Sequence, residues 1–210
     1  MTSIWVLLSR LLASSKAHDP ETNVAIFREI VTILSVLVRL RRDLVITTLP
    51  HLNNIIRQLI FTLRRPRPLL GAKQYSIVAD TLPVWINPSH PLGVEESKDL
   101  SRLLTSLSTK TLVRVHNTSA ELQKPESLTR PLSKHVTCII QAYLDALNDP
   151  LCILAADIRR ELQPGLFVLC DMLNEHTRDS FMVSALDAGG KAAMKSLWRE
   201  YEKQRYTGNG

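Results

Sequence analysis

Residues 24–40, VAIFREIVTILSVLVRL, decide the fold class of this 210-residue chain. Apolar residues recur there every three or four positions, which is the spacing of one face of an α-helix. A second apolar set widens this face around much of the helix, so neighbours are expected on more than one side. A helix start is indicated just upstream, with Asp19 as the N-cap, Pro20 at the first helical position and Glu21 in the first turn. We therefore expect a helix inside a stack.

Helical spacing continues along most of the chain, and 34 leucines against 7 glycines favour helices over a sheet. Residues 43–63 are interrupted by Pro50, and a proline disrupts the interior of a helix. One helix is therefore expected to end near Thr48 and another to begin at Pro50. Further helices are predicted over residues 94–107, 132–147 and 153–162, from Pro164 onward, and over 178–186 and 188–206. Alternation of helix, proline turn and helix is typical of stacked helical repeats, although no strict sequence repeat is present.

The expected fold is all-α, with stacked antiparallel helices of the HEAT/armadillo-like helical-repeat type. A long proline-rich connection is predicted at its centre, because five prolines fall between residues 66 and 91. Part of this connection, residues 77–85, is compatible with an extended segment or a short helix. Residues 1–70 are expected to form a basic helical segment that continues an upstream stack. Residues 71–210 are expected to form a C-terminal helical domain, and both parts to make one continuous unit.

The formal net charge of +6 is concentrated in the first third of the chain. Residues 1–78 carry +7, whereas residues 79–210 carry −1. Arginine dominates the two basic clusters, and its guanidinium suits bidentate contact with phosphates or carboxylates. Two interpretations stay open: a surface for RNA phosphates or acidic partners, and helix ends where cations are favoured by the helix dipole. The candidate contact residues are Arg39, Arg41, Arg42, Arg64, Arg65 and Arg67.

A second basic feature lies near the end of the chain. Four cations follow one another every fourth residue and therefore form one stripe on a helix. They are Lys191, Lys195, Arg199 and Lys203. Trp198 and Tyr201 lie nearby, and a basic stripe with aromatic neighbours fits RNA or an acidic protein surface. The alternative is an ordinary surface helix, in which Glu200 and Glu202 reduce the positive field.

No sequence motif indicates catalysis or a cofactor. The chain has no GxSxG, HExxH, GxGxxG or GxxxxGK[ST] motif. His135 and Cys138 stand three residues apart but have no third metal ligand nearby in sequence. We therefore expect no catalytic residue, no metal, no cofactor and no small-molecule substrate. No membrane association is expected either, since charged residues interrupt the apolar stretches 4–13 and 24–40, and a span needs about 20 apolar residues.

Several stretches resemble the C-terminal domain of the unhealthy ribosome biogenesis protein 2 family. These are DIRRELQPGLFVLCD (157–171), ALDAGGK (185–191), SLWREYEK (196–203), PLGVEE (91–96) and LSRLLT (100–105). The resemblance covers roughly residues 80–207, and the N-terminal third resembles the family only in its helical character. It implies a non-enzymatic scaffold of the nucleolus that acts in early assembly of the large ribosomal subunit and in precursor rRNA processing.

The resemblance also implies partners among the pre-ribosomal assembly factors, namely a larger helical-repeat protein and a complex with a DEAD-box RNA helicase. Direct contact with precursor rRNA stays open against a purely protein–protein adaptor that touches no RNA. Salt-dependent RNA binding would separate these two hypotheses. An enzyme built on helices would need convergent polar residues in a pocket, and a peripheral membrane adaptor would bind anionic vesicles.

Overall fold

A computed structural model of the chain describes residues 2–14, 21–110 and 127–207. These residues form eleven α-helices and one pair of two-residue strands, which confirms the expected all-α class. The helices are α1 (Thr2–Leu11), α2 (Val24–Leu40), α3 (Arg42–Ile46), α4 (Leu49–Thr62), α5 (Ala72–Ala79), α6 (Val94–Ser106), α7 (Thr129–Leu132), α8 (Val136–Asn148), α9 (Ala156–Asp171), α10 (Glu175–Ser184) and α11 (Ala188–Thr207). Strands β1 (Arg65–Pro66) and β2 (Cys152–Ile153) pair in antiparallel fashion.

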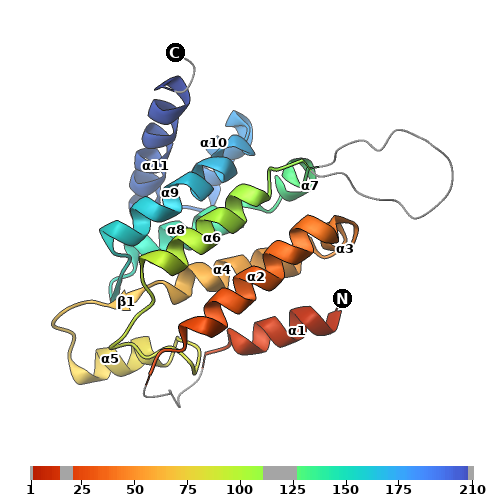
Figure 1. The fold of residues 1–210 in the computed structure, drawn as a ribbon. Helices are drawn as coiled ribbons and strands as arrows, with labels where there is room; N and C mark the ends of the chain where they lie inside the picture. Colours follow the sequence, from red (N-terminus) through yellow and green to blue (C-terminus); the bar gives the residue numbers. More distant parts are fainter. Residues whose placement is uncertain (1, 15–20, 111–126, 208–210) are drawn as a thin grey trace, which may run out of the picture.

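The long helices lie in two layers (Figure 1). In the first layer α1 contacts α4, α4 contacts α8, and α8 contacts α11. In the second layer α2 contacts α6, and α6 contacts α9. Helices α1, α4 and α8 run in one direction, whereas α2, α6 and α9 run in the opposite direction. The chain therefore adds one helix to each layer in turn.

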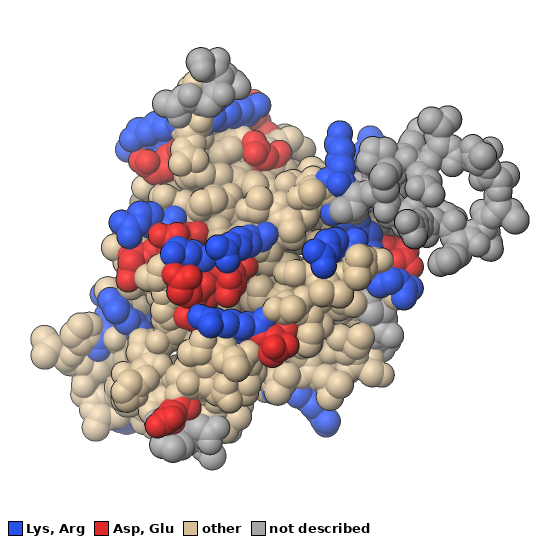
Figure 2. All heavy atoms as spheres, in the orientation of Figure 1, with Lys and Arg blue, Asp and Glu red and all other residues tan. Residues whose placement is uncertain are grey.

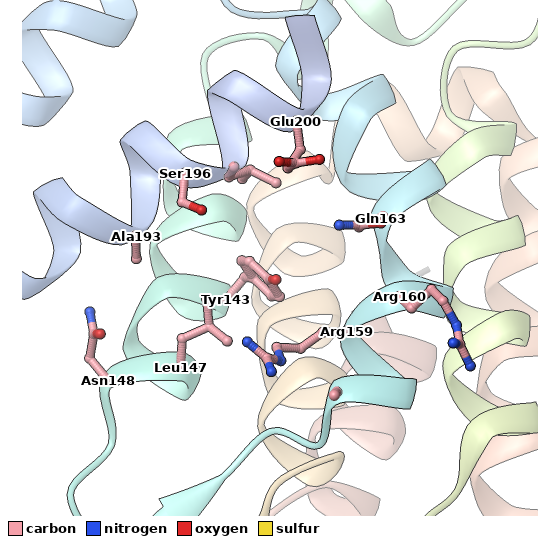
Figure 3. Close-up of a pocket in the computed structure, with 11 residues that line it drawn as sticks. Tyr143, Leu147, Asn148, Arg159, Arg160, Gln163, Ala193, Ser196 and Glu200 are labelled. Carbon is pink, nitrogen blue, oxygen red and sulfur yellow. The ribbon is translucent and has the colours of Figure 1, made fainter. Parts of the chain in front are cut away.

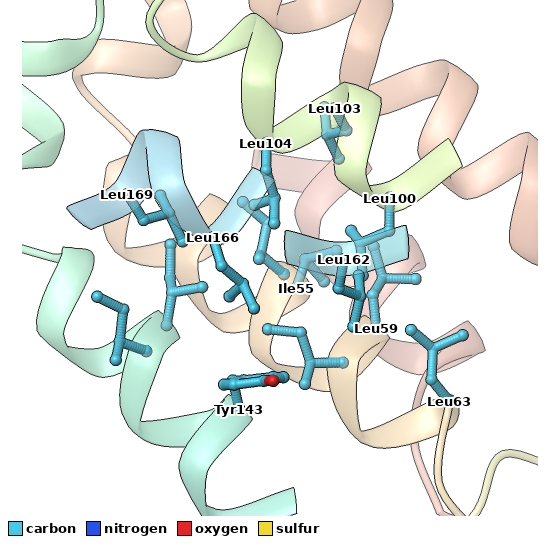
Figure 4. Packing of buried hydrophobic residues seen from close by; sticks show 14 of the residues in the cluster. Ile55, Leu59, Leu63, Leu100, Leu103, Leu104, Tyr143, Leu162, Leu166 and Leu169 are labelled. Atoms are coloured by element: carbon cyan, nitrogen blue, oxygen red, sulfur yellow. The ribbon is translucent and has the colours of Figure 1, made fainter. Parts of the chain in front are cut away.

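One hydrophobic cluster runs through both layers and includes side chains from α1 to α11. Leu59 of α4, Leu104 of α6, Tyr143 of α8 and Leu162 of α9 all belong to it (Figure 4). Leucine dominates this cluster, as the composition of the chain leads one to expect. Residues on both sides of position 70 contribute to the same cluster, and α4 packs directly on α8.

The start of α2 differs from the prediction. Asp19 and Pro20 lie outside the described residues, Glu21 precedes the helix, and α2 begins at Val24. The backbone before the helix is bonded to the proline-rich segment, since the Asn23 N–H donates to the Trp85 carbonyl oxygen at 2.9 Å. The prediction that Glu21 lies in the first turn is therefore wrong, because this segment pairs with the proline-rich segment instead.

Pro164 marks a second difference. A helix was expected to begin there, whereas α9 runs through it without interruption. Proline cannot donate to the preceding turn, but the next N–H, of Gly165, donates to Ser101 Oγ of α6 at 3.0 Å. A Cβ atom on Gly165 would lie only 2.8 Å from the Cβ atom of Leu104. Helices α6 and α9 therefore cross at a separation that requires glycine.

The proline-rich segment between α4 and α6 contains β1, α5 and several turns. Trp85 lies within it and is buried, and its indole N–H donates to the carbonyl oxygen of Leu11 at 2.6 Å. The segment is thus tied to the end of α1. Pro50 stands in the first turn of α4, which confirms the predicted break between α3 and α4. None of the helices described by the structure is long and apolar enough to cross a membrane.

Candidate interaction surfaces

The first arginine cluster, at the junction of α2 and α3, splits into exposed and buried members. Arg39 is exposed, and Arg41 is exposed but pairs with Asp43 at 3.2 Å. Arg42 is only 2% exposed, and its Nε donates to the carbonyl oxygen of Val38 at 3.0 Å. The guanidinium is buried against the last turn of α2, where a cation is favoured, so the structure does not favour the predicted contact of Arg42 with a partner.

The second cluster lies at the far end of α4 and is joined to the end of α8. Arg64 Nη1 lies 2.5 Å from Asp149 Oδ2, and the guanidinium also covers the ring of Phe61 at 4.7 Å. Arg67 Nη2 donates to the backbone carbonyl oxygen of Asp149 at 3.0 Å. Arg65 is exposed on β1. We call Arg64, Arg67 and Asp149 the helix clasp.

Asp149 is held from several directions. Its Oδ1 accepts the N–H groups of Leu151 at 2.8 Å and of Cys152 at 3.0 Å. Burial acts to raise the pKa of Asp149, but these N–H donors and the charge of Arg64 outweigh it, so the pKa is lowered. The Arg64 side chain is 13% exposed and bound to an ionised partner. Arg64 therefore supports the fold, and its predicted contact with RNA or an acidic partner stays a prediction that its internal ion pair does not favour.

The structure does not bring the two arginine clusters together. They lie at opposite ends of α4, whose 14 residues span about 21 Å. Over the face between them, basic and acidic side chains are mixed (Figure 2). Ion pairs account for this mixture, and they involve Arg28, Glu95, Glu96, Lys98, Asp99 and Arg102. The positive surplus of the first third therefore forms no continuous basic face in this view.

The stripe on α11 does face solvent along one side of its helix. Met194, Leu197 and Tyr201 are buried on the side toward α8, and the cations lie on the other side. Lys195, Arg199 and Lys203 are exposed, whereas Lys191 is half-buried. Lys203 pairs with Glu200 at 3.1 Å. Within the described part of the chain, Lys191, Lys195 and Arg199 have no ion-pair partner.

The aromatic residues beside this stripe are already engaged in packing. The Trp198 indole N–H donates to Glu202 Oε1 at 2.8 Å, and the Arg178 guanidinium covers the Trp198 ring at 4.8 Å. The Tyr201 hydroxyl donates to Asp171, and burial together with this hydrogen bond raises the pKa of Tyr201 to about 12. Base stacking on these two rings is therefore not supported, and what the stripe presents to solvent is its charge.

A cleft that the sequence did not reveal opens between α8, α9 and α11 (Figure 3). Its volume is about 580 Å³. Leu147 and Tyr143 of α8 form the floor, Arg159 and Gln163 line the α9 side, and Ser196 lines the α11 side. The sequence signal for this site is the Arg159–Arg160 pair. The net charge of the C-terminal part does not show this pair, because nearby acidic residues balance the two positive charges.

The described residues offer no group of three His, Cys, Asp or Glu side chains that could hold a metal ion. The cysteines do not indicate redox chemistry, because burial raises the pKa of the Cys152 thiol to about 11 and that of Cys170 to about 12. Cys138 is half-buried on α8. The described residues present charged surface and several clefts, including the one between α8, α9 and α11.

A family model described as the Urb2/Npa2 family matches residues 1–209. The match includes the N-terminal third, where the sequence resemblance extended only to helical character. No curated protein and no solved structure matches the chain.

Proposed function

This chain belongs to the Urb2/Npa2 family, a family of ribosome biogenesis factors, and from that premise we propose that it is a non-enzymatic scaffold of the nucleolus. In this role it acts in early assembly of the large ribosomal subunit and in processing of precursor rRNA. The family match over residues 1–209 is the observation that carries the proposal. The partners proposed are other assembly factors, including a larger helical-repeat protein and a complex with a DEAD-box RNA helicase.

The two-layer arrangement supports a scaffold of the HEAT or armadillo type. The pairs α1/α2, α4/α6 and α8/α9 each place one helix in each layer, and the two helices of a pair run in opposite directions. Stacks of such pairs present long surfaces on which several partners can be held at once. An assembly factor that has no chemistry of its own needs surfaces of this kind.

Precursor rRNA is proposed to bind along the solvent side of α11. Lys191, Lys195 and Arg199 offer positive charge that no described acidic side chain neutralises, whereas Arg42 and Arg64 are used inside the fold. A polyanion gains most where cations are exposed and unpaired. The exposed arginines of the two clusters are proposed as two separate further contact sites, Arg39 and Arg41 at one end of α4 and Arg65 and Arg67 at the other.

The test is the salt dependence of binding to a labelled fragment of large-subunit precursor rRNA. We compare the unchanged chain with the variant Lys191→Glu/Lys195→Glu/Arg199→Glu. Loss of three phosphate contacts should weaken binding and lower the slope of log K against log salt by about 2 for single-stranded RNA. Thermal unfolding should stay unchanged, because these side chains make no ion pair with a described residue.

The matched control is Arg10→Glu/Lys73→Glu/Lys134→Glu, which changes the net charge equally at exposed positions elsewhere. It should retain most of the affinity and the full slope. Equal losses in the two variants would mean that net charge alone governs binding. If neither variant changes the slope, α11 makes no RNA contact and the protein–protein adaptor becomes the better description.

A further inference from the structure

The cleft between α8, α9 and α11 combines an apolar floor with hydrogen-bond donors. Leu147, Ala193 and Leu197 contribute apolar surface. Tyr143 is only 5% exposed yet lines the cleft, and no described residue accepts a hydrogen bond from its hydroxyl. The hydroxyl oxygen is not among the fully buried polar atoms that lack a partner, so it is open to the cleft. The floor of the cleft thus presents a donor that a bound molecule can satisfy (Figure 3).

Arg159 adds a positive charge at the same place. It is exposed on the α9 side, and no described carboxylate pairs with it. Burial raises the pKa of Tyr143 to about 12, while the nearby charge of Arg159 acts in the opposite direction, so the two groups lie close enough to interact. The carboxylate on the opposite wall, Glu200, is paired with Lys203 at 3.1 Å. The cleft therefore offers donors to an acidic group.

We propose that this cleft binds a short acidic segment of a partner protein. One carboxylate of the segment meets Arg159 and the Tyr143 hydroxyl, and a neighbouring apolar side chain packs on Leu147 and Leu197. Charge-assisted hydrogen bonds to a carboxylate are strong when water is partly excluded. An RNA chain fits less well, because Glu200 lines the cleft, whereas Lys191, Lys195 and Arg199 of the basic stripe do not. The inference rests on the proposed scaffold role but uses a separate surface.

The first experiment identifies what occupies the cleft in the full-length protein in cells. A photoreactive amino acid replaces Ser196, which lines the cleft, and as a control it replaces Lys195, which faces solvent on the other side of α11. We expect the probe at position 196 to crosslink peptides in which Asp or Glu adjoins an apolar residue. Arg159→Glu should abolish these crosslinks, and the probe at position 195 should not yield them.

The second experiment measures affinity with the crosslinked peptide made synthetically. Arg159→Glu should weaken binding by at least tenfold, Tyr143→Phe by several-fold, and Arg159→Lys by less than Arg159→Glu. A peptide with Lys in place of its acidic residue should bind Arg159→Glu better than it binds the unchanged protein. Melting temperatures should agree within about 2 °C for the Arg159 variants, since this side chain is exposed.

Three results would overturn the proposal. The first is RNA as the adduct at position 196, and the second is the absence of any crosslink there above that at position 195. The third is peptide affinity that does not respond to Arg159→Glu. A different pair of results would contradict the proposed scaffold role. These are that no crosslinked peptide comes from a ribosome assembly factor, and that rRNA processing stays normal when the protein is depleted.

Discussion

Arg64 and Asp149 join the ends of two helices of the same layer, with Nη1 of the arginine 2.5 Å from Oδ2 of the aspartate. Arg64 follows α4 and Asp149 follows α8, and the β1–β2 pair continues the connection immediately beyond them. Both side chains are mostly buried, and Asp149 also accepts two backbone N–H groups. The basic cluster at residues 64–67 was expected to contact a ligand, but its member Arg64 stabilises the packing of α4 against α8.

Removing either side of the helix clasp should destabilise the protein. We expect Asp149→Ala to lower the free energy of unfolding by about 3 kcal/mol, because it leaves a largely buried guanidinium and two N–H groups without partners. Arg64→Met should cost about 2 kcal/mol, whereas Arg65→Met, at the exposed neighbour, should cost under about 0.5 kcal/mol. Denaturant unfolding measures these values. Strict additivity of Asp149→Ala and Arg64→Met would show that the two residues are not coupled.

Acid should weaken the clasp in a defined direction. The pKa of Asp149 is lowered in the folded protein, so its contribution to stability is present above the ordinary carboxyl pKa of about 3.9 and is lost as the pH falls through the folded value. The difference in unfolding free energy between the unchanged protein and Asp149→Asn should therefore shrink below about pH 4. A difference that grows on acidification would contradict the lowered pKa.

The crossing of α6 and α9 should be sensitive to a single methyl group. Gly165→Ala places a Cβ atom 2.8 Å from that of Leu104 and 2.9 Å from the Ser101 carbonyl oxygen. We expect a loss of about 2 kcal/mol, which is typical of overpacking. Gly189→Ala is the control, since a Cβ atom there meets no atom nearer than 3.5 Å and alanine favours a helix. Calorimetry that finds both variants equally stable would refute the close crossing.

Neighbouring arginines at the end of α2 should respond differently to the same substitution. Arg42→Gln removes a buried donor to the Val38 carbonyl oxygen and should cost about 2 kcal/mol. Arg39→Gln changes an exposed side chain and should stay within about 0.5 kcal/mol of the unchanged protein. Thermal unfolding of the two variants decides the point. Similar melting temperatures would mean that Arg42 is not held in the interior.

Local spacing was sufficient to predict the helical class, the long helices and the break before Pro50, because helix periodicity depends on residues three or four positions apart. The predicted helix start at Pro164 is wrong because Ser101, which accepts the N–H of Gly165, lies 64 residues away on another helix. The start of α2 was misplaced for a similar reason, since the segment before it pairs with Trp85. Such compensation depends on tertiary contacts and leaves no local pattern.

The charge pattern located the candidate surfaces but not the internal partners of their residues. Arg39 and Arg42 are three positions apart, and only the turn into α3 decides which of them is buried. The partner of Arg64 stands 85 positions downstream, and the cleft around Arg159 requires three helices to meet. Regular spacing did reveal the stripe on α11, because all of its members lie on one helix.

We propose that this Urb2/Npa2 family member contacts precursor rRNA during ribosome assembly through the solvent side of α11. Ultraviolet crosslinking in cells, followed by sequencing of the bound RNA, tests it most directly. We expect enrichment of large-subunit precursor rRNA, with at least a fivefold loss in Lys191→Glu/Lys195→Glu/Arg199→Glu and little loss in Arg10→Glu/Lys73→Glu/Lys134→Glu. Absence of precursor rRNA, or equal recovery from both variants, would contradict it.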